Sequence, residues 1–308
     1  MKTFPLLIAA GLWAALPLAA SAEIERVVEK SFNVQPGGTL SVETSGGSIR
    51  VETAQTSQVN VVAKQRIRAS SEAEADRLLK DLDLTIEQNG NDVRARAKLN
   101  GIKWGRQPVQ VDFVVSVPTR YHADLRTSGG NVDVGDLDGR LQARTSGGNV
   151  TLGRITGDVD AGTSGGDVRL AEGKGRVKLG TSGGNIRVQR AGGHTELDTS
   201  GGNIEIESVE GSIQADTSGG NVRAGIRGPL QGDCVLGTSG GQVRVTVDKT
   251  AAFNLDASTS GGDVEAEGLT ITIERGGSGK SRLAGKVNGG GPLLKLRSSG
   301  GDIDVKTR

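Results

Sequence analysis

The side chains best suited to chemistry are few and far apart in this sequence. Its two histidines, His122 and His194, each lie five residues before a Thr-Ser-Gly-Gly motif. Four repeats separate them, which predicts a distance of about 19 Å at ~4.8 Å per stacked repeat. They therefore cannot share a metal ion or act as a catalytic pair. We predict that both are solvated surface side chains.

The single cysteine, Cys234, occupies a position that is apolar in the neighbouring repeats. A buried thiol behaves as a small hydrophobic group and carries little thiolate. A repeated serine also has no unique base to activate it. We therefore predict no nucleophilic catalysis.

Aspartate follows the double glycine at Asp167, Asp263 and Asp302. Calcium-binding β-rolls carry Gly-Gly-x-Gly-x-Asp nonapeptides, whereas here the period is 18 residues and the same position is Asn in five copies. Because Ca²⁺ requires several converging oxygens, we predict no calcium site. We assign no catalytic, cofactor-binding or metal-binding residue, and we predict that the protein is not an enzyme.

One repeat organises the elements that carry these residues. The motif begins at Thr44 and recurs at Thr127, Thr145, Thr163, Thr181, Thr199, Thr217, Thr238 and Thr259, with a Ser-Ser-Gly-Gly variant at Ser298. From Thr127 to Thr217 the motif recurs in five steps of 18 residues, and two steps of 21 and one of 39 follow. The step of 39 leaves room for one eroded coil near 276–279. Such fixed self-similarity is typical of a solenoid.

Apolar and polar residues alternate on both sides of each motif. The fifth residue after the motif's first residue is always β-branched: Ile49, Val132, Val150, Val168, Ile186, Ile204, Val222, Val243, Val264 and Ile303. This period of two predicts strands with one buried face, two strands per repeat. Glycines at both corners fit the positive φ angles that tight turns need. We predict an all-β fold, a single-stranded parallel β-helix (β-solenoid) of about 18 residues per coil, with a dry interior and an outer wall without a pocket.

The ends of the chain differ from this regular part. Residues 1–22 contain Lys2, an apolar run and Ala20-Ser21-Ala22, typical of a cleaved signal peptide; a membrane anchor is the alternative. Residues 23–120 are predicted as an irregular β-rich part with one amphipathic helix near 71–82, and 121–308 as the regular β-solenoid continuous with it. The last strand-like residues, up to Arg308, predict an open edge guarded only by Lys306 and Arg308.

Charge and aromatic content narrow the classes of partner. Without Lys2 the chain has 36 basic residues (37 − 1) against 36 acidic ones, which argues against nucleic acid. After signal removal the aromatic residues are Phe32, Trp104, Phe113, Tyr121 and Phe253. No repeated column of rings offers a stacking platform for sugars, so a polysaccharide enzyme is disfavoured.

The signal peptide, the irregular β-rich start and the tandem Thr-Ser-Gly-Gly-Asn-Val units together resemble the bacterial putative-adhesin family, exported β-strand-repeat domains of unknown function. The resemblance covers most of residues 39–308. It implies a right-handed β-helix and an adhesin role, and it supplies no catalytic residues or cofactors.

We therefore expect a non-enzymatic exported scaffold or adhesin-like interaction protein of the bacterial envelope. A periplasmic location is expected first, with secretion or cell-surface display as alternatives. The expected partners are envelope proteins or polysaccharides, with no nucleic acid, and the chain should be soluble after signal removal. The alternative functions are an end-to-end filament former, similar to the bactofilin solenoids, and a polysaccharide-binding or polysaccharide-active protein.

Overall fold

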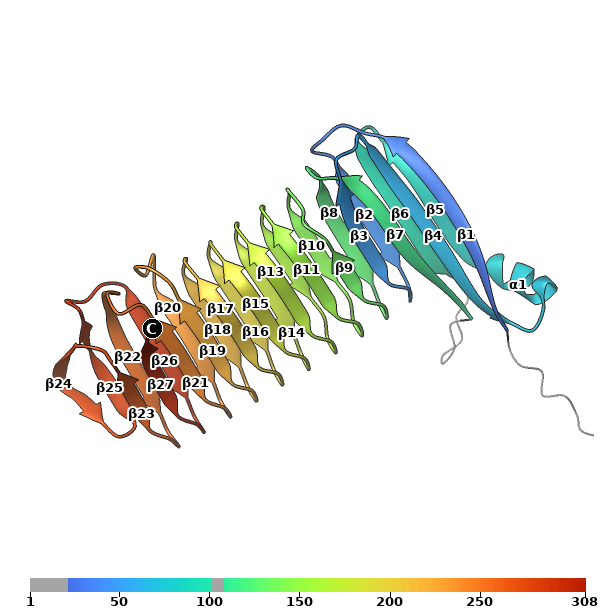
Figure 1. Ribbon diagram of the computed structural model, residues 1–308. Coiled ribbons are helices and arrows are strands. Elements are labelled where there is room, and N and C mark those ends of the chain that lie inside the picture. The colour runs from blue at the N-terminus through green and yellow to red at the C-terminus, as the bar shows by residue number, and fades with distance from the viewer. Residues whose placement is uncertain (1–21, 101–107) are drawn as a thin grey trace, which may run out of the picture.

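The computed structural model describes residues 22–100 and 108–308, and these form a long rod made of two facing sheets (Figure 1). Sheet A has 13 strands and sheet B has 14 among the described residues. The predicted signal peptide lies outside the described residues except for Ala22, where the first strand begins. Trp104 also lies outside them.

The middle of the rod confirms the predicted coils, because successive strands alternate between the two sheets. Val150 pairs in parallel with Val132 on one side and with Val168 on the other, so residues 18 apart stack directly. Sheet A contains β9 (Val132–Val134), β11 (Val150–Ile155), β13 (Val168–Gly173), β15 (Ile186–Ala191), β17 (Ile204–Val209), β19 (Val222–Ile226) and β21 (Val243–Val247). Sheet B contains β8 (His122–Thr127), β10 (Leu141–Arg144), β12 (Val159–Gly162), β14 (Val177–Thr181), β16 (Thr195–Thr199), β18 (Ile213–Thr217) and β20 (Cys234–Thr238).

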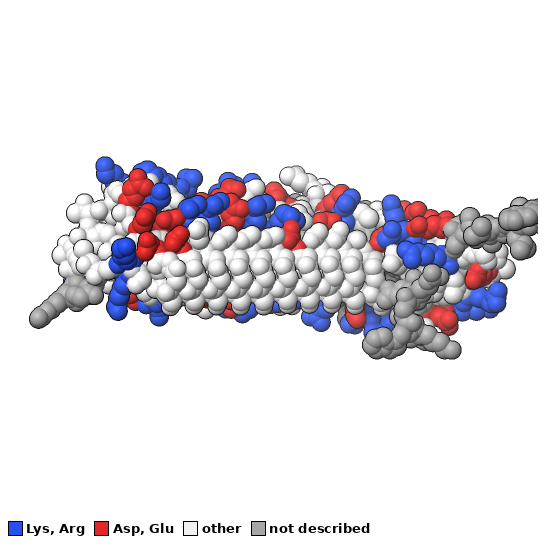
Figure 2. Space-filling view, turned by 90° about the horizontal axis from the view of Figure 1, so that it is seen from below, with Lys and Arg blue, Asp and Glu red and all other residues white. Residues whose placement is uncertain are grey.

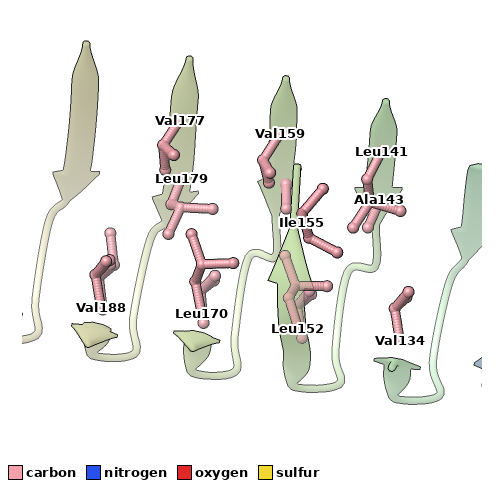
Figure 3. Packing of buried hydrophobic residues seen from close by; sticks show 14 of the residues in the cluster. Val134, Leu141, Ala143, Leu152, Ile155, Val159, Leu170, Val177, Leu179 and Val188 are labelled. Carbon is pink, nitrogen blue, oxygen red and sulfur yellow. The ribbon is translucent and has the colours of Figure 1, made fainter. Parts of the chain in front are cut away.

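The core is a continuous apolar layer between the two sheets. Leu141 and Val159 from sheet B point toward Leu152 and Leu170 from sheet A (Figure 3). The β-branched residue two positions after each double glycine is buried in every motif coil except one, where Val264 is half-buried. Each fully buried Val, Leu or Ile stabilises the fold by about 1.5–3 kcal/mol relative to an exposed one. Each coil can bury these residues only against its neighbours.

The first motif coil is inserted between coils that come later in the sequence. It consists of β2 (Thr39–Thr44) and β3 (Ile49–Ala54). β2 lies between β6 (Asp92–Leu99) and β8, and β3 lies between β7 (Val109–Pro118) and β9. The first motif coil therefore stacks directly on the regular repeat, although the motifs at Thr44 and Thr127 are far apart in the sequence.

Antiparallel strands and one helix extend the sheets beyond this coil. β4 (Gln58–Ala69) joins β7 to the edge strand β1 (Ala22–Asn33), and β5 (Leu82–Asn89) edges sheet B beside β6. α1 (Glu72–Leu79) begins after Ser71, whose Oγ accepts the N–H of Glu74 at 3.3 Å. Arg26 of β1 holds α1 through Glu72 at 2.9 Å and Asp76 at 2.7 Å. α1, the one helix of the described residues, is too short and too polar to span a bilayer.

The last motif coil is inserted in the same way, which makes the predicted open C-terminal edge wrong. β26 (Leu293–Ser298) lies between β20 and β22 (Phe253–Thr259). β27 (Ile303–Thr307) lies between β21 and β23 (Val264–Glu267). Because β27 is paired on both sides, Lys306 and Arg308 guard no open edge. The filament hypothesis loses the edge on which it depended.

The eroded coil expected near 276–279 is also wrong. β24 (Ile271–Gly279) and β25 (Arg282–Val287) form an antiparallel hairpin that pairs with β22. Sheet B therefore ends in this hairpin, and sheet A ends in the short strand β23. The long last step in motif spacing is explained by the hairpin.

The double glycines serve a purpose different from the predicted one. None of them has a positive φ angle; among the described residues, the glycines that do are Gly37, Gly90, Gly228, Gly268, Gly289 and Gly290. A Cβ on the second motif glycine would instead collide with the preceding coil. At Gly184 it would lie 2.8 Å from the nitrogen of Asp167 and closer still to the carbonyl of Gly166. The motif needs this glycine because the coils approach so closely there.

Candidate functional site

The motif threonines fasten each coil to its neighbour. Thr181 Oγ1 donates to the carbonyl oxygen of Gly166 in the preceding coil at 2.9 Å and accepts the N–H of Gly184 at 3.3 Å. Equivalent bonds recur along the stack, and Ser298 makes them in the variant motif. The hydroxyls thus bond to glycine carbonyls rather than to one another. The motif therefore acts as a structural clamp between adjacent coils.

A second ladder runs through the residue that follows the double glycine. Asn185 Oδ1 accepts the backbone N–H of Asn203 at 2.9 Å, and Asn203 Oδ1 accepts that of Asn221 at 2.8 Å. Asp167 Oδ1 likewise accepts the backbone N–H of Asn185 at 2.9 Å. An amide oxygen and a carboxylate oxygen are interchangeable in this role, which explains why Asp can replace Asn at this position. Asp167 and Asp302 therefore have a structural partner, the N–H of the next coil.

A shallow groove runs along the outer face of sheet A beside this ladder. Its volume is about 370 Å³. The polar side chains that line it belong to five stacked coils: Asp167, Arg169, Asn185, Arg187, Asn203, Glu205, Asn221, Arg223, Gln242 and Arg244. We call it the Asn–Arg groove. The prediction of an outer wall without a pocket is therefore wrong on this face.

Ion pairs hold the groove's arginines in place. Glu205 bonds Arg187 at 2.9 Å and lies 3.8 Å from Arg223. Arg169 bonds Asp167 at 2.6 Å. The backbone N–H of Asn185 lowers the pKa of the Asp167 carboxyl, and Arg169 acts in the same direction against the opposing effect of burial. Arg244 bonds Asp304, just outside the lining, at 2.8 Å, so the excess positive charge of the groove lies where Arg187 and Arg223 share one carboxylate.

Next to the groove, the Thr-Ser-Gly-Gly corner forms an uncharged stripe along the rod. The serine and first glycine are exposed in every motif except the first, for example Ser182 and Gly183. Figure 2 shows this stripe with charged side chains gathered on either side of it. The charged side chains of sheet A therefore lie beside the corner and not on it.

The histidines lie far from the groove, at the opposite corner of their coils. His122 Nδ1 accepts the backbone N–H of Arg140 at 2.9 Å, and His194 Nδ1 lies 2.7 Å from Ser212 Oγ. His194 is exposed and His122 half-buried. Each histidine therefore contacts the next coil through Nδ1. The prediction of solvated surface side chains did not include these contacts.

Cys234 lies in the inward column, as predicted, and is fully buried. Burial raises the pKa of its thiol, so little thiolate is present at neutral pH. Within the described residues, no group of three or more His, Cys, Asp or Glu side chains could hold a metal ion.

Three motif serines, Ser164, Ser182 and Ser239, stand in the order Gly-x-Ser-x-Gly that many hydrolases use for their nucleophile. In those enzymes the serine lies at a sharp turn from a strand into a helix. Here each serine is exposed at a corner between two strands, as Ser182 is between β14 and β15. The histidines are at the other end of the sheet B strands, so these serines have no imidazole base within reach.

Two carboxylates are stacked on the outer face of sheet B. Asp198 and Asp216 are register partners in β16 and β18. Burial raises the pKa of each carboxyl, and the negative charges of Glu196 and Asp216 raise that of Asp198 further. Like charges at directly opposed positions destabilise a sheet.

The groove could have been found in the sequence by reading the outward column in coil order. That column is Arg169, Arg187, Glu205, Arg223, Arg244 over five consecutive coils. The prediction of an outer wall without a pocket overlooked this local run of arginines.

Comparison with known proteins gives the family and the fold. A "putative adhesin" from Parabacteroides distasonis has 11% sequence identity and a TM-score of 0.51, with 92% of this chain and 97% of that one covered. A "putative adhesin" from Parabacteroides merdae has 11% identity and a TM-score of 0.43, covering 92% and 96%. A "putative lipid binding protein" from Parabacteroides distasonis has 12% identity and a TM-score of 0.43, covering 91% and 96%. No curated protein gives a significant match.

The family assignment rests on the sequence profile. The profile described as Toastrack DUF4097, a domain of unknown function rather than an enzyme family, matches residues 38–306. That range spans the repeat and the β-rich N-terminal part, which confirms the resemblance that the motifs indicated. The chain therefore belongs to the Toastrack DUF4097 family.

Proposed function

We propose that this chain is a non-enzymatic, exported, adhesin-like interaction protein of the bacterial envelope and that the Asn–Arg groove is its binding surface. The observation that carries the proposal is the groove itself. Five consecutive coils present the same two polar columns side by side, and the backbone ladder fixes their spacing. A regular array of this kind suits a long ligand that lies along the rod.

A binding role fits the chemistry of the groove better than catalysis. Its arginines and carboxylates pair with one another, as Arg187 does with Glu205, so no described lining residue is poised as a nucleophile beside a base. The solved structure of the fold with the TM-score of 0.51 is named a putative adhesin, which supports the same class of function.

Binding to envelopes tests the proposal. The full chain would be expressed with its own N-terminal segment, purified, labelled and sedimented with envelope fragments of its source bacterium. Arg223→Gln removes a groove arginine while Glu205 keeps its partner Arg187. Arg50→Gln is the matched control, because Arg50 is exposed in the same outward column but outside the groove.

We expect saturable binding that Arg223→Gln weakens and Arg50→Gln leaves unchanged. Binding that ignores both substitutions would contradict the groove as the interaction surface. Release of reducing ends from envelope polysaccharide by the purified chain would contradict the non-enzymatic part.

Export is tested separately. N-terminal sequencing of the protein recovered from periplasm and medium should begin at Glu23, as the predicted cleavage after Ala22 requires. Recovery of an uncleaved chain from the membrane fraction would instead support an anchor.

A further inference from the structure

We propose that the Asn–Arg groove binds a linear acidic glycan, a polymer of uronic acid sugars, laid along the rod axis. This inference rests on the proposed function and names the class of its ligand. It follows from which hydrogen-bonding groups the fold leaves available in the groove.

The ladder occupies at least one lone pair of each asparagine oxygen in this column and leaves amide N–H donors. The Oδ1 atoms of Asn185, Asn203 and Asn221 each accept a backbone N–H from the next coil. One hydrogen of the Asn203 amide is used on Asn185, at 3.2 Å. An amide nitrogen has two donors, so the column still presents N–H groups to the groove. A matching ligand must be rich in acceptors.

The arginine column adds charge and further donors. Arg187 bonds Glu205 through Nε and one terminal nitrogen, at 3.1 and 2.9 Å, and a guanidinium carries five donors. Its side chain is 55% exposed and that of Arg223 is 59% exposed, so both remain accessible. Because these two arginines share the single carboxylate of Glu205, this part of the groove favours further carboxylates, which guanidinium binds through two parallel hydrogen bonds.

The side chains that line the groove also disfavour other classes of polymer. Single-stranded nucleic acid and neutral sugars bind largely by stacking on aromatic rings, and no described lining residue is aromatic. The aromatic side chains of Phe113, Tyr121 and Phe253 are all buried in the core. An acidic peptide would bring its own backbone N–H groups, and the ladder leaves each of these asparagine oxygens at most one lone pair to accept them.

The coil spacing sets the length of glycan that fits. The groove residues repeat once per coil, with a spacing of ~4.8 Å along the rod. This spacing is close to the length that one sugar ring adds to an extended glycan. The groove spans five coils, from Asp167 to Arg244. Affinity should therefore rise with chain length up to about five sugars and then level off.

Oligogalacturonates of increasing length are the probes, measured by calorimetry against the full purified chain. The key variant is Asn203→Asp. Aspartate keeps the oxygen that accepts the N–H of Asn221, as Asp167 does for Asn185, but it removes the amide donor and adds a negative charge. The fold should therefore persist, and an unchanged melting curve checks this.

We expect binding that weakens with added salt, drops about tenfold in Arg223→Gln and at least as much in Asn203→Asp, and stays unchanged in Arg50→Gln. Equal affinity for neutral cello-oligosaccharides or for polyglutamate would overturn the proposal. So would the absence of binding to oligogalacturonates and to alginate oligomers.

The two proposals fail in different ways. If Arg223→Gln weakens envelope binding while acidic glycans do not bind, the ligand class is wrong and the groove remains the interaction surface. If envelope binding does not respond to Arg223→Gln, the proposed function itself is wrong.

Discussion

Replacing Gly184 by alanine places a methyl group at the closest approach of two coils. The new Cβ would lie 2.8 Å from the nitrogen of Asp167 and nearer still to the carbonyl of Gly166, inside the 3.0 Å that real Cβ contacts essentially never enter. The neighbours are backbone atoms, so no flexible side chain can move aside. The coils would have to separate locally.

The cost of that separation can be worked from the bonds on either side. Thr181 Oγ1 bonds the carbonyl of Gly166 at 2.9 Å, and the N–H of Asn185 bonds Asp167 Oδ1 at 2.9 Å. Overpacking costs about 1–3 kcal/mol, and two weakened hydrogen bonds add about 1 kcal/mol each. We expect Gly184→Ala to destabilise the chain by about 3–5 kcal/mol.

The adjacent glycine is the matched control. A Cβ at Gly183 would lie 3.5 Å from Gly165 O, an ordinary contact, and Gly183 has no positive φ angle. Gly183→Ala should therefore be neutral or stabilising by up to about 1 kcal/mol. Urea unfolding followed by circular dichroism measures both. If Gly184→Ala unfolds within 1 kcal/mol of Gly183→Ala, close approach is not what requires the second glycine.

Three further outcomes follow from the ladders and the buried groups. Thr181→Val should cost about 1–2 kcal/mol, because the Gly166 carbonyl loses its donor, whereas Ser182→Ala at the exposed corner should leave urea unfolding unchanged. Asp198→Asn should raise the melting temperature at pH 7, because it relieves Asp216 of a like charge. Both carboxyl pKa values are raised, so the folded wild type takes up protons more readily than the unfolded chain. The wild type therefore gains stability as the pH falls through those values, and the advantage of Asp198→Asn should shrink toward about pH 4; an advantage independent of pH would contradict this. Cys234 should react with Ellman's reagent only as fast as the chain opens, and rapid labelling of the native protein would contradict its burial.

The repeat was predictable because each coil solves the same burial problem with the same residues. Val150 and Leu152 alternate with polar neighbours, and only a strand with one buried face suits that pattern. The 18-residue step then requires that equivalent residues stack. These local rules account for the strands, the corners and the inward position of Cys234.

The order in which the coils stack at the two ends of the rod could not be derived from these local rules. Thr44 and Thr127 bear identical motifs, and stacking chemistry does not depend on how many residues lie between them. The pairing of Ser298 with both Thr238 and Thr259 is likewise invisible in the spacing. The unequal steps of the repeat were the available signal, and we interpreted the last of them as containing an eroded coil.

The reason for the double glycine was also out of reach of the sequence. A positive φ angle and a close approach both select glycine, and only coordinates distinguish them. At the second motif glycine the neighbouring carbonyl decides the matter.

The inserted coil of β26 and β27 changes how the rod would respond to mechanical load. A strand at a free edge can be peeled away, with its bonds breaking one after another. β27 is bonded to β21 on one side and to β23 on the other, so tension applied at Arg308 must shear two rows of bonds at once. At the opposite end the segment 39–54 is also paired on both sides, but the first strand, β1, is an edge strand paired with β4 alone. Load at Arg308 therefore meets two rows of bonds, whereas load on β1 meets one.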